Sequence, residues 1–275
     1  MCVDSVPPKH CQAPVRSAAM DLTGRTLSKV PEITALFWVT KLLTTAMGES
    51  TSDYLVFRVN PVVAVGLGTV VLLGALVLQF RAVRYIPWIY WFTVLMVAIV
   101  GTMAADVLHK QFHVPYAAST AFFAVVLTVV FVVWHRVEGT LSIHSIVTRR
   151  RELFYWAAVM ATFALGTAAG DLAAKTIGLG YLTSAVLFAA LMAVAAVGYW
   201  RFHLNAILAF WAAYVLTRPL GASIADWLGK PKALSGLGWG DAVVTAIFAL
   251  LIVACVGYLT VANREARVGS AEGSH

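Results

Sequence analysis

The sequence predicts an all-α polytopic membrane protein with eight transmembrane helices arranged as four parallel two-helix repeats. The first observation is its composition: of 275 residues, 60% are hydrophobic and only 12% are charged. A soluble domain of this length carries about a quarter charged residues and could not cover so much apolar surface. The second observation is a set of long apolar segments, and the third is a phrase that occurs four times.

The apolar segments each have the length that a helix needs to cross the hydrocarbon core, about 20 residues. We place the eight spans at 33–56, 61–80, 86–108, 115–134, 153–174, 181–200, 204–228 and 241–262. The membrane domain is then 33–262, with repeats at 33–80, 86–134, 153–200 and 204–262. Residues 1–32 form an N-terminal tail without a recognisable signal peptide, and 263–275 form a C-terminal tail.

The distribution of basic residues orients the chain. Thirteen of the 20 Lys and Arg residues fall in the two tails, the 81–84 and 135–152 loops and at Arg201, against five at the opposite ends of the spans. By the positive-inside rule both termini are cytoplasmic. The excess positive charge is therefore explained by membrane topology, and no nucleic-acid partner is expected.

The repeated phrase is a glycine, four residues and an aspartate, in "MGESTSDYL", "VGTMAADVL", "LGTAAGDLA" and "LGASIADWL". The repeat glycines are Gly48, Gly101, Gly166 and Gly221, and the repeat aspartates are Asp53, Asp106, Asp171 and Asp226. Each phrase lies late in an odd-numbered span. Small residues four apart allow close helix packing in lipid, and the even-numbered spans carry no charge in their interiors. We therefore expect the odd helices to form an inner layer and the even helices an outer one.

The aspartates permit two interpretations. A carboxylate within a span is costly and faces the protein interior or a wet cavity. Lys110, Lys175 and Lys230 each follow a repeat aspartate by four residues, so the acids could form structural ion pairs at the outer interface. Alternatively, the four carboxylates converge on one site for an ion or a proton.

Repeats 1 and 4 carry further charges within their spans. These charges single out the contact between the two repeats, and we call such a contact between neighbouring repeats a seam. Lys41, Thr45 and Glu49 lie on one stripe of the first span, and Arg218 stands beside Pro219 in the seventh. If four parallel repeats close into a ring, spans 7 and 1 are neighbours, and an offset of about 6 Å brings Arg218 within reach of Glu49. We therefore expect Arg218 to contact Glu49, or both residues to share one cavity with Lys41.

The ligand inventory favours hard cations. Carboxylates and hydroxyls suit protons, Mg²⁺, Mn²⁺ or Ca²⁺, and the candidate metal ligands are Glu49, Asp106, Asp171 and Asp226. The three cysteines form no metal-binding pair, and no Walker A, HExxH, GxSxG or CxxC motif is present. We expect no organic cofactor, and the chain is not expected to be an enzyme.

The phrases "KLLTTAMGESTSDYL", "GTMAADVLH", "GTLSIHSI", "FALGTAAGDL" and "YVLTRPLGASIADWLG" resemble a family of bacterial integral membrane proteins built from a repeat of unknown function. Its members are often described as uncharacterised membrane-anchored proteins. The resemblance covers about residues 30–262 and implies a multi-pass protein of the bacterial inner membrane. It implies no substrate.

The residues therefore carry the functional hypothesis. We expect a secondary transporter of a small cation, either a hard divalent metal or a proton-coupled cation or both, with a carboxylate-lined site between spans 1, 3, 5 and 7. The residues expected to bind the ion are Glu49, Asp53, Asp106, Asp171, Asp226 and Thr45, with Lys41 and Arg218 as counter-charges. An anion or zwitterion transporter that uses inward-facing lysines is the first alternative, and a structural or sensory protein with paired charges is the second. The partners expected are the lipid bilayer and a small cation or proton, and the sequence leaves the oligomeric state open.

Overall fold

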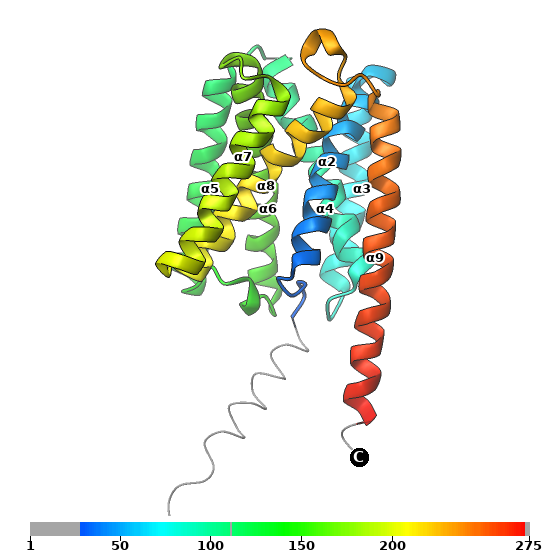
Figure 1. Ribbon diagram of the computed structural model, residues 1–275. Helices are drawn as coiled ribbons and strands as arrows, with labels where there is room; N and C mark the ends of the chain where they lie inside the picture. The colour runs from blue at the N-terminus through cyan, green and yellow to red at the C-terminus, as the bar shows by residue number, and fades with distance from the viewer. Residues whose placement is uncertain (1–27, 111, 273–275) are drawn as a thin grey trace, which may run out of the picture.

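The computed structural model describes residues 28–110 and 112–272, and over these residues it is all-helical, with no β-strand (Figure 1). Three short helical turns are η1 (Ile143–Ser145), η2 (Leu172–Thr176) and η3 (Lys232–Leu234). The eight long helices are α2 (Ala35–Arg58), α3 (Pro61–Arg81), α4 (Pro87–Lys110), α5 (Tyr116–Glu138), α6 (Arg149–Asp171), α7 (Gly180–Phe202), α8 (Ala206–Gly229) and α9 (Asp241–Glu272).

The eight helices correspond to the eight predicted spans. Seven of them are long and apolar enough to cross a membrane. The eighth, α2, has the same length as α4 and α8 but carries Lys41, Glu49 and Asp53, which lower its hydropathy. An all-α polytopic membrane fold is thus confirmed.

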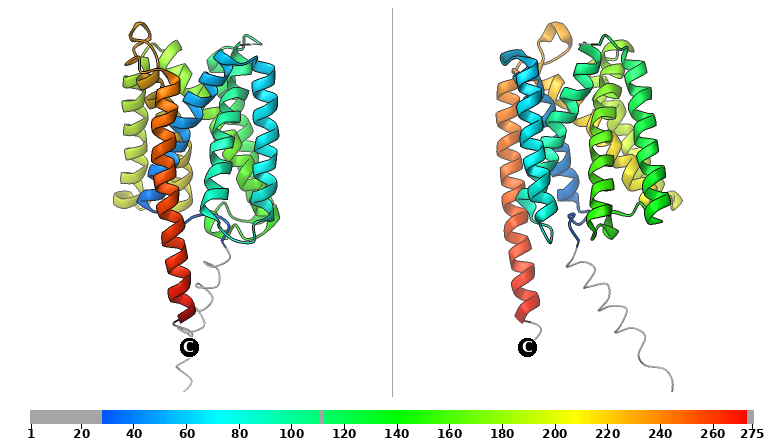
Figure 2. Two further views of the ribbon diagram at one scale, coloured as in Figure 1. Left: turned by 90° about the vertical axis from the view of Figure 1, so that its right-hand side faces the viewer. Right: turned by 180° about the vertical axis from the view of Figure 1, so that it is seen from behind.

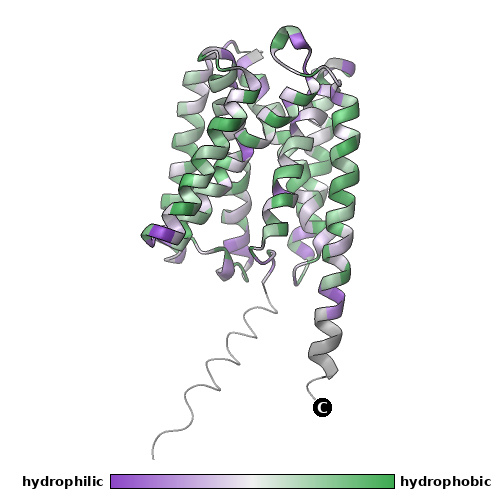
Figure 3. Cartoon of the chain, in the orientation of Figure 1, coloured by the Kyte–Doolittle hydropathy of each residue, from purple (hydrophilic) through white to green (hydrophobic). Residues whose placement is uncertain are grey.

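The expected two layers are present. The apolar stretches of α4, α6 and α8 are 56–67% buried within the protein, whereas those of α3, α5, α7 and α9 are only 17–22% buried. The helix α2 packs against α4 and α8 and belongs to the same inner group. The outer helices present apolar residues outward along their length (Figure 3), as lipid requires.

The four inner helices form a closed ring. α2 contacts α4, α4 contacts α6, α6 contacts α8, and α8 returns to α2. Each outer helix packs mainly on the inner helix of the following repeat: α3 on α4, α5 on α6, α7 on α8, and α9 on α2 (Figures 1 and 2). The last helix therefore closes the ring onto the first, and no repeat can bury its apolar faces without its neighbour.

The helix boundaries follow local capping chemistry. Thr34 and Thr148 accept hydrogen bonds from backbone N–H groups in the first turns of α2 and α6. Asn60 and Asn205 do the same for α3 and α8. These side chains satisfy donors that a helix start leaves without intrahelical partners. The capping residues lie within five residues of the predicted span starts.

One end of the bundle carries both ends of the described chain, residues 28 and 272, below the ring in Figure 1, and we call it the terminal end. The other carries the repeat aspartates, and we call it the aspartate end. The predicted tails need two corrections at the terminal end. Residues 28–32 pack onto the bundle, because Lys29 is buried and its Nζ lies 2.7 Å from Glu152 Oε2. The helix α9 continues past residue 262 to Glu272 and projects beyond the other helices (Figure 2).

Candidate ion site along the ring axis

A stripe of residues spaced by four runs along each inner helix. On α2 it consists of Phe37, Lys41, Thr45, Glu49 and Asp53, and each residue is at most 7% exposed. Residues four apart lie on one helix face, and each step rises about 6 Å. The equivalent positions of the other repeats, counted from the repeat glycine, complete five layers across the ring.

The repeat glycines hold the ring together. A Cβ atom added to any of them would lie less than 3.0 Å from an atom of the next inner helix. The atom met belongs each time to the residue three positions before that helix's own repeat glycine. These four residues form what we call the arginine layer: Thr45, Ala98, Phe163 and Arg218. The same contact thus recurs four times around the ring, which explains why the phrase requires glycine.

Arg218 reaches from this layer to the next one along the axis. The residues that follow the repeat glycines form the threonine layer: Glu49, Thr102, Thr167 and Ala222. One nitrogen of the guanidinium, Nη2, donates to the side chains of the first three of these. Arg218 therefore contacts the same position in each of the other three repeats, and in its own repeat this position is an alanine.

The ion pair between Arg218 and Glu49 is present, as the sequence predicted. Nη2 lies 2.7 Å from Glu49 Oε2, and the Arg218 side chain is 0% exposed. Because both groups are buried away from water, each charge is compensated mainly by the other. However, Nε and Nη1 of Arg218 are buried without a protein partner among the described residues.

Lys41 lies one step nearer the terminal end. With Val94, Val159 and Tyr214 it forms the lysine layer. Its Nζ donates to the backbone oxygen of Tyr214 at 3.1 Å and lies 3.8 Å from the centroid of the Tyr214 ring. No carboxylate of the described residues pairs with it. Lys41 is therefore a fully buried amine held by one carbonyl and by aromatic rings.

An aromatic layer closes the axis towards the terminal end. It consists of Phe37, Tyr90, Tyr155 and Phe210, all buried. The two tyrosine hydroxyls share a hydrogen bond, and the two phenylalanine rings are 6.3 Å apart. This layer separates the charged residues from the terminal end.

The repeat aspartates form the last layer, at the aspartate end, and are 5–7% exposed. Oxygens of Glu49, Asp53 and Asp226 lie within 4.8 Å of one another, and we call these three residues the acid cluster. Of the four metal ligands that the sequence suggested, this cluster contains Glu49 and Asp226, and Asp53 joins them. Asp106 and Asp171 are outside it.

Lys230 is seated against the acid cluster. Its Nζ forms an ion pair with Asp53 across the seam, lies 3.8 Å from Asp226, and is 3.4 Å from Asp241. Burial lowers the pKa of Lys230, but the carboxylates of Asp53 and Asp226 raise it by more, so the net shift is upward. The Lys230 ammonium therefore lies among three carboxylates, at a position that also suits a metal cation.

The sequence did not predict this role for Lys230, which it treated as the local partner of Asp226. Asp241 was missed as well, because it stands at the start of α9 far from any repeat phrase. By contrast, Lys175 does pair with Asp171, at 2.7 Å, and its side chain remains 40% exposed. The local pair is thus present in both repeats, but in repeat 4 the lysine also pairs with Asp53 of the neighbouring helix α2.

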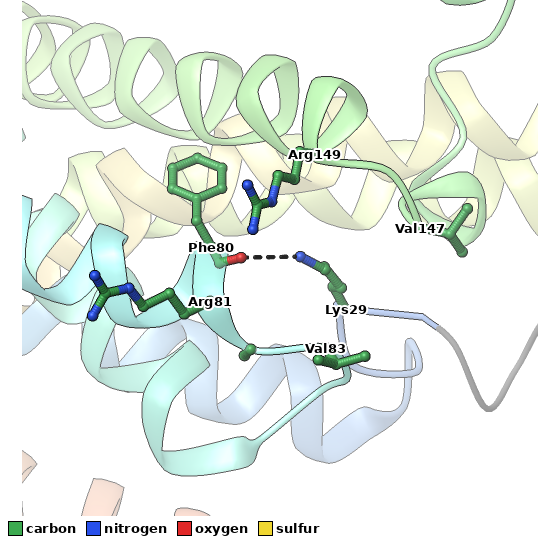
Figure 4. Close-up of a pocket in the computed structure, with 7 residues that line it drawn as sticks. Lys29, Phe80, Arg81, Val83, Val147 and Arg149 are labelled. Carbon is green, nitrogen blue, oxygen red and sulfur yellow. Dashed lines mark hydrogen bonds between the residues drawn. The ribbon is translucent and has the colours of Figure 1, made fainter.

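A separate pocket lies at the terminal end, between the end of α3 and the start of α6 (Figure 4). It measures about 420 Å³ and is lined by residues that include Lys29, Arg81 and Arg149. The Lys29 ammonium is already bound to Glu152, which also accepts from Gln79 at 2.9 Å. The pocket is remote from the aspartate layer and contributes nothing to the acid cluster.

The comparisons with known proteins agree with the internal repeat. No curated protein and no solved structure matches the chain. A family model described as Repeat of Unknown Function (DUF347) matches four times, at residues 36–85, 89–140, 154–204 and 209–265. Each match begins within an inner helix; the first three end just beyond the following outer helix, and the fourth ends within α9. The chain therefore belongs to the family of proteins built from this repeat.

Proposed function

We propose that the protein is a secondary transporter of a small hard cation, with the acid cluster as its binding site. The observation that carries the proposal is the convergence of Glu49, Asp53 and Asp226 within 4.8 Å, from two helices of repeats 1 and 4. Three carboxylates at this separation offer the oxygen ligands that Mg²⁺, Mn²⁺ and Ca²⁺ prefer. Buried acids inside a span are costly unless they have a function or a partner.

Lys230 supplies the exchange step in this proposal. Its ammonium pairs with Asp53 and Asp226, so an arriving cation must displace it. The displaced ammonium remains tethered at the end of α8 and can return when the cation leaves. The carboxylates are thereby compensated by Lys230 when the site is empty and by the cation when it is occupied. This lowers the free-energy cost of the empty site.

The two ends of the axis differ in a way that suits alternating access. At the aspartate end the carboxylates are 5–7% exposed, whereas the residues of the lysine and arginine layers are at most 1% exposed. A cation would enter at the aspartate end and pass the sealed layers only after the inner helices shift. The closed ring offers a route for that shift, because each repeat can rock against its neighbours about the glycine contacts.

We further propose that the protein lies in a bacterial inner membrane with both termini in the cytoplasm. This rests on the bias of basic residues toward the terminal end. Reporter fusions after residues 60, 112, 178 and 235 should report the opposite side of the membrane. A cytoplasmic signal from two or more of them would reverse or break the topology.

The transport proposal is tested with purified protein in liposomes. Uptake of Mn²⁺ is followed with a trapped dye that Mn²⁺ quenches, and Mg²⁺ and Ca²⁺ are added as competitors. Wild-type protein is expected to admit Mn²⁺, and Asp226→Asn is expected to abolish uptake, since Asn keeps the shape but removes the charge. Asp106→Asn is the matched control, because Asp106 is a repeat aspartate outside the acid cluster.

Two outcomes would refute the proposal. One is that no divalent cation enters liposomes that contain folded wild-type protein. The other is that Asp226→Asn and Asp106→Asn reduce uptake equally, because the acid cluster would then have no special part. A loss of uptake in Asp226→Asn alone, with Mn²⁺ binding weakened to the same extent, supports it.

A further inference from the structure

We propose that the lysine and arginine layers form a second site, which binds a small monovalent anion between Lys41 and Arg218. This site is distinct from the acid cluster and has the opposite sign. It is carried by an excess of buried hydrogen-bond donors in the middle of the axis.

Arg218 supplies the first group of donors. All its polar contacts are made through Nη2, while Nε and Nη1 have no protein partner among the described residues. The side chain is 0% exposed. Nε and Nη1 therefore present N–H groups that can donate to a small anion. A buried guanidinium with unsatisfied donors is costly, so an acceptor is expected there.

Lys41 supplies the second group. Its ammonium has three N–H donors and one oxygen acceptor, the Tyr214 carbonyl. The same Phe163 ring lies 5.4 Å from Lys41 Nζ and 5.6 Å from Arg218 Cζ, which places both cations in one neighbourhood. Among the described residues, two side chains thus bring unused donors to adjoining layers.

The charges in this region do not balance. Glu49 neutralises Arg218, and the aromatic, lysine and arginine layers contain no acid. Lys41 is therefore a surplus positive charge at 1% exposure. The remaining axial residues of the two layers, Val94, Val159, Ala98 and Thr45, are small or medium-sized. A single compact anion, a halide or a small carboxylate, would satisfy both the donors and the charge.

The experiment measures anion binding by the full-length protein in detergent without divalent cations. Chloride or formate is titrated against gluconate at constant ionic strength, and the thermal unfolding midpoint is recorded. Wild-type protein is expected to show a saturable rise in the midpoint. Lys41→Met is expected to weaken the apparent anion affinity by about tenfold or more, the effect of losing one charged hydrogen-bond donor. Lys175→Met removes an exposed lysine and should bind the anion as wild type does.

A second variant tests the proposal in case Lys41→Met does not fold. Arg218→Lys keeps a cation beside Glu49 but removes the free guanidinium donors, so it should also lose the anion response. A midpoint in wild type that does not depend on the anion would overturn the proposal. An equal response in Lys41→Met, Arg218→Lys and Lys175→Met would overturn it too, because that pattern is a general salt effect. Because the assay contains no transported cation, its outcome is independent of the proposed transport.

Discussion

The seam between repeats 4 and 1 and the seam between repeats 2 and 3 share one packing design but differ in chemistry. At both, a repeat glycine receives the next inner helix: Gly221 meets Thr45, and Gly101 meets Phe163. Two ion pairs cross the 4–1 seam along the axis, Arg218 with Glu49 and Lys230 with Asp53. The ion pairs between repeats 2 and 3, of Glu138 with Arg150 and Arg151, lie at the terminal end and outside the axis. Apart from the two repeat aspartates, the axial residues of repeats 2 and 3 are tyrosines, threonines, valines, an alanine and a phenylalanine.

This difference distinguishes the residues that pack the ring, which are the repeat glycines, from those that give it a polar site, which are the charged residues of repeats 1 and 4. The glycine contact is repeated at every seam, so the same packing closes the ring each time. Along the axis, the charges beyond the four repeat aspartates are Lys41, Glu49 and Arg218, and they belong to repeats 1 and 4. We therefore expect packing substitutions to act alike at all seams and charge substitutions to act mainly at one.

The largest effect is expected from Arg218→Met at the 4–1 seam. Removing one partner of a buried ion pair costs about 3–5 kcal/mol, because Glu49 is left without compensation. Thr102 and Thr167 also lose a donor. Urea denaturation of detergent-solubilised protein should show this loss, and Arg218→Met combined with Glu49→Gln should be less damaging than the single change.

The control is Arg201→Met, which removes an exposed arginine near the terminal end of α7 and should leave stability within about 0.5 kcal/mol of wild type. If the double variant were as unstable as the sum of its single changes, Arg218 and Glu49 would not be coupled. The 4–1 seam would then differ from the 2–3 seam in composition only.

The sequence predicted the framework of this comparison well. Four copies of one phrase specified the ring, the two layers and the approach of Arg218 to Glu49, because a parallel repeat fixes which helices are neighbours. It could not predict that Lys230 reaches across to Asp53. The spacing of four residues between Asp226 and Lys230 fits a lysine that pairs only within its own helix and equally a lysine that turns toward the next helix. The contribution of Asp241 and the docking of Lys29 depend on tertiary contacts that no local pattern reveals.

An intermediate effect is expected from Gly→Ala substitutions, and it should be similar at both seams. In Gly101→Ala the new methyl group would lie 2.8 Å from Phe163 Cβ. Overpacking of this kind costs about 1–3 kcal/mol, and Gly221→Ala should fall in the same range. Gly74→Ala on the outer helix α3 meets nothing within 4 Å, so it should be neutral or stabilise by up to about 1 kcal/mol.

These glycine variants are compared by thermal unfolding in one detergent. A large loss at Gly221 with none at Gly101 would contradict the shared packing design. The repeats would then have diverged in structure as well as in charge.

The smallest effect is expected from Lys175→Met, which removes the partner of Asp171 in repeat 3. The two groups lie 2.7 Å apart on successive turns, but the lysine side chain is 40% exposed. Pairs of this kind contribute about 0–1 kcal/mol, because water already solvates the ammonium.

In repeat 4 the equivalent lysine, Lys230, is 14% exposed and pairs with carboxylates of three helices, α2, α8 and α9. Lys230→Met should therefore destabilise the protein clearly more than Lys175→Met, and divalent cations should restore more of the lost stability in Lys230→Met. Equal losses in the two variants, unaffected by Mn²⁺, would mean that the two lysines have one structural role and that the 4–1 seam has no special affinity for cations.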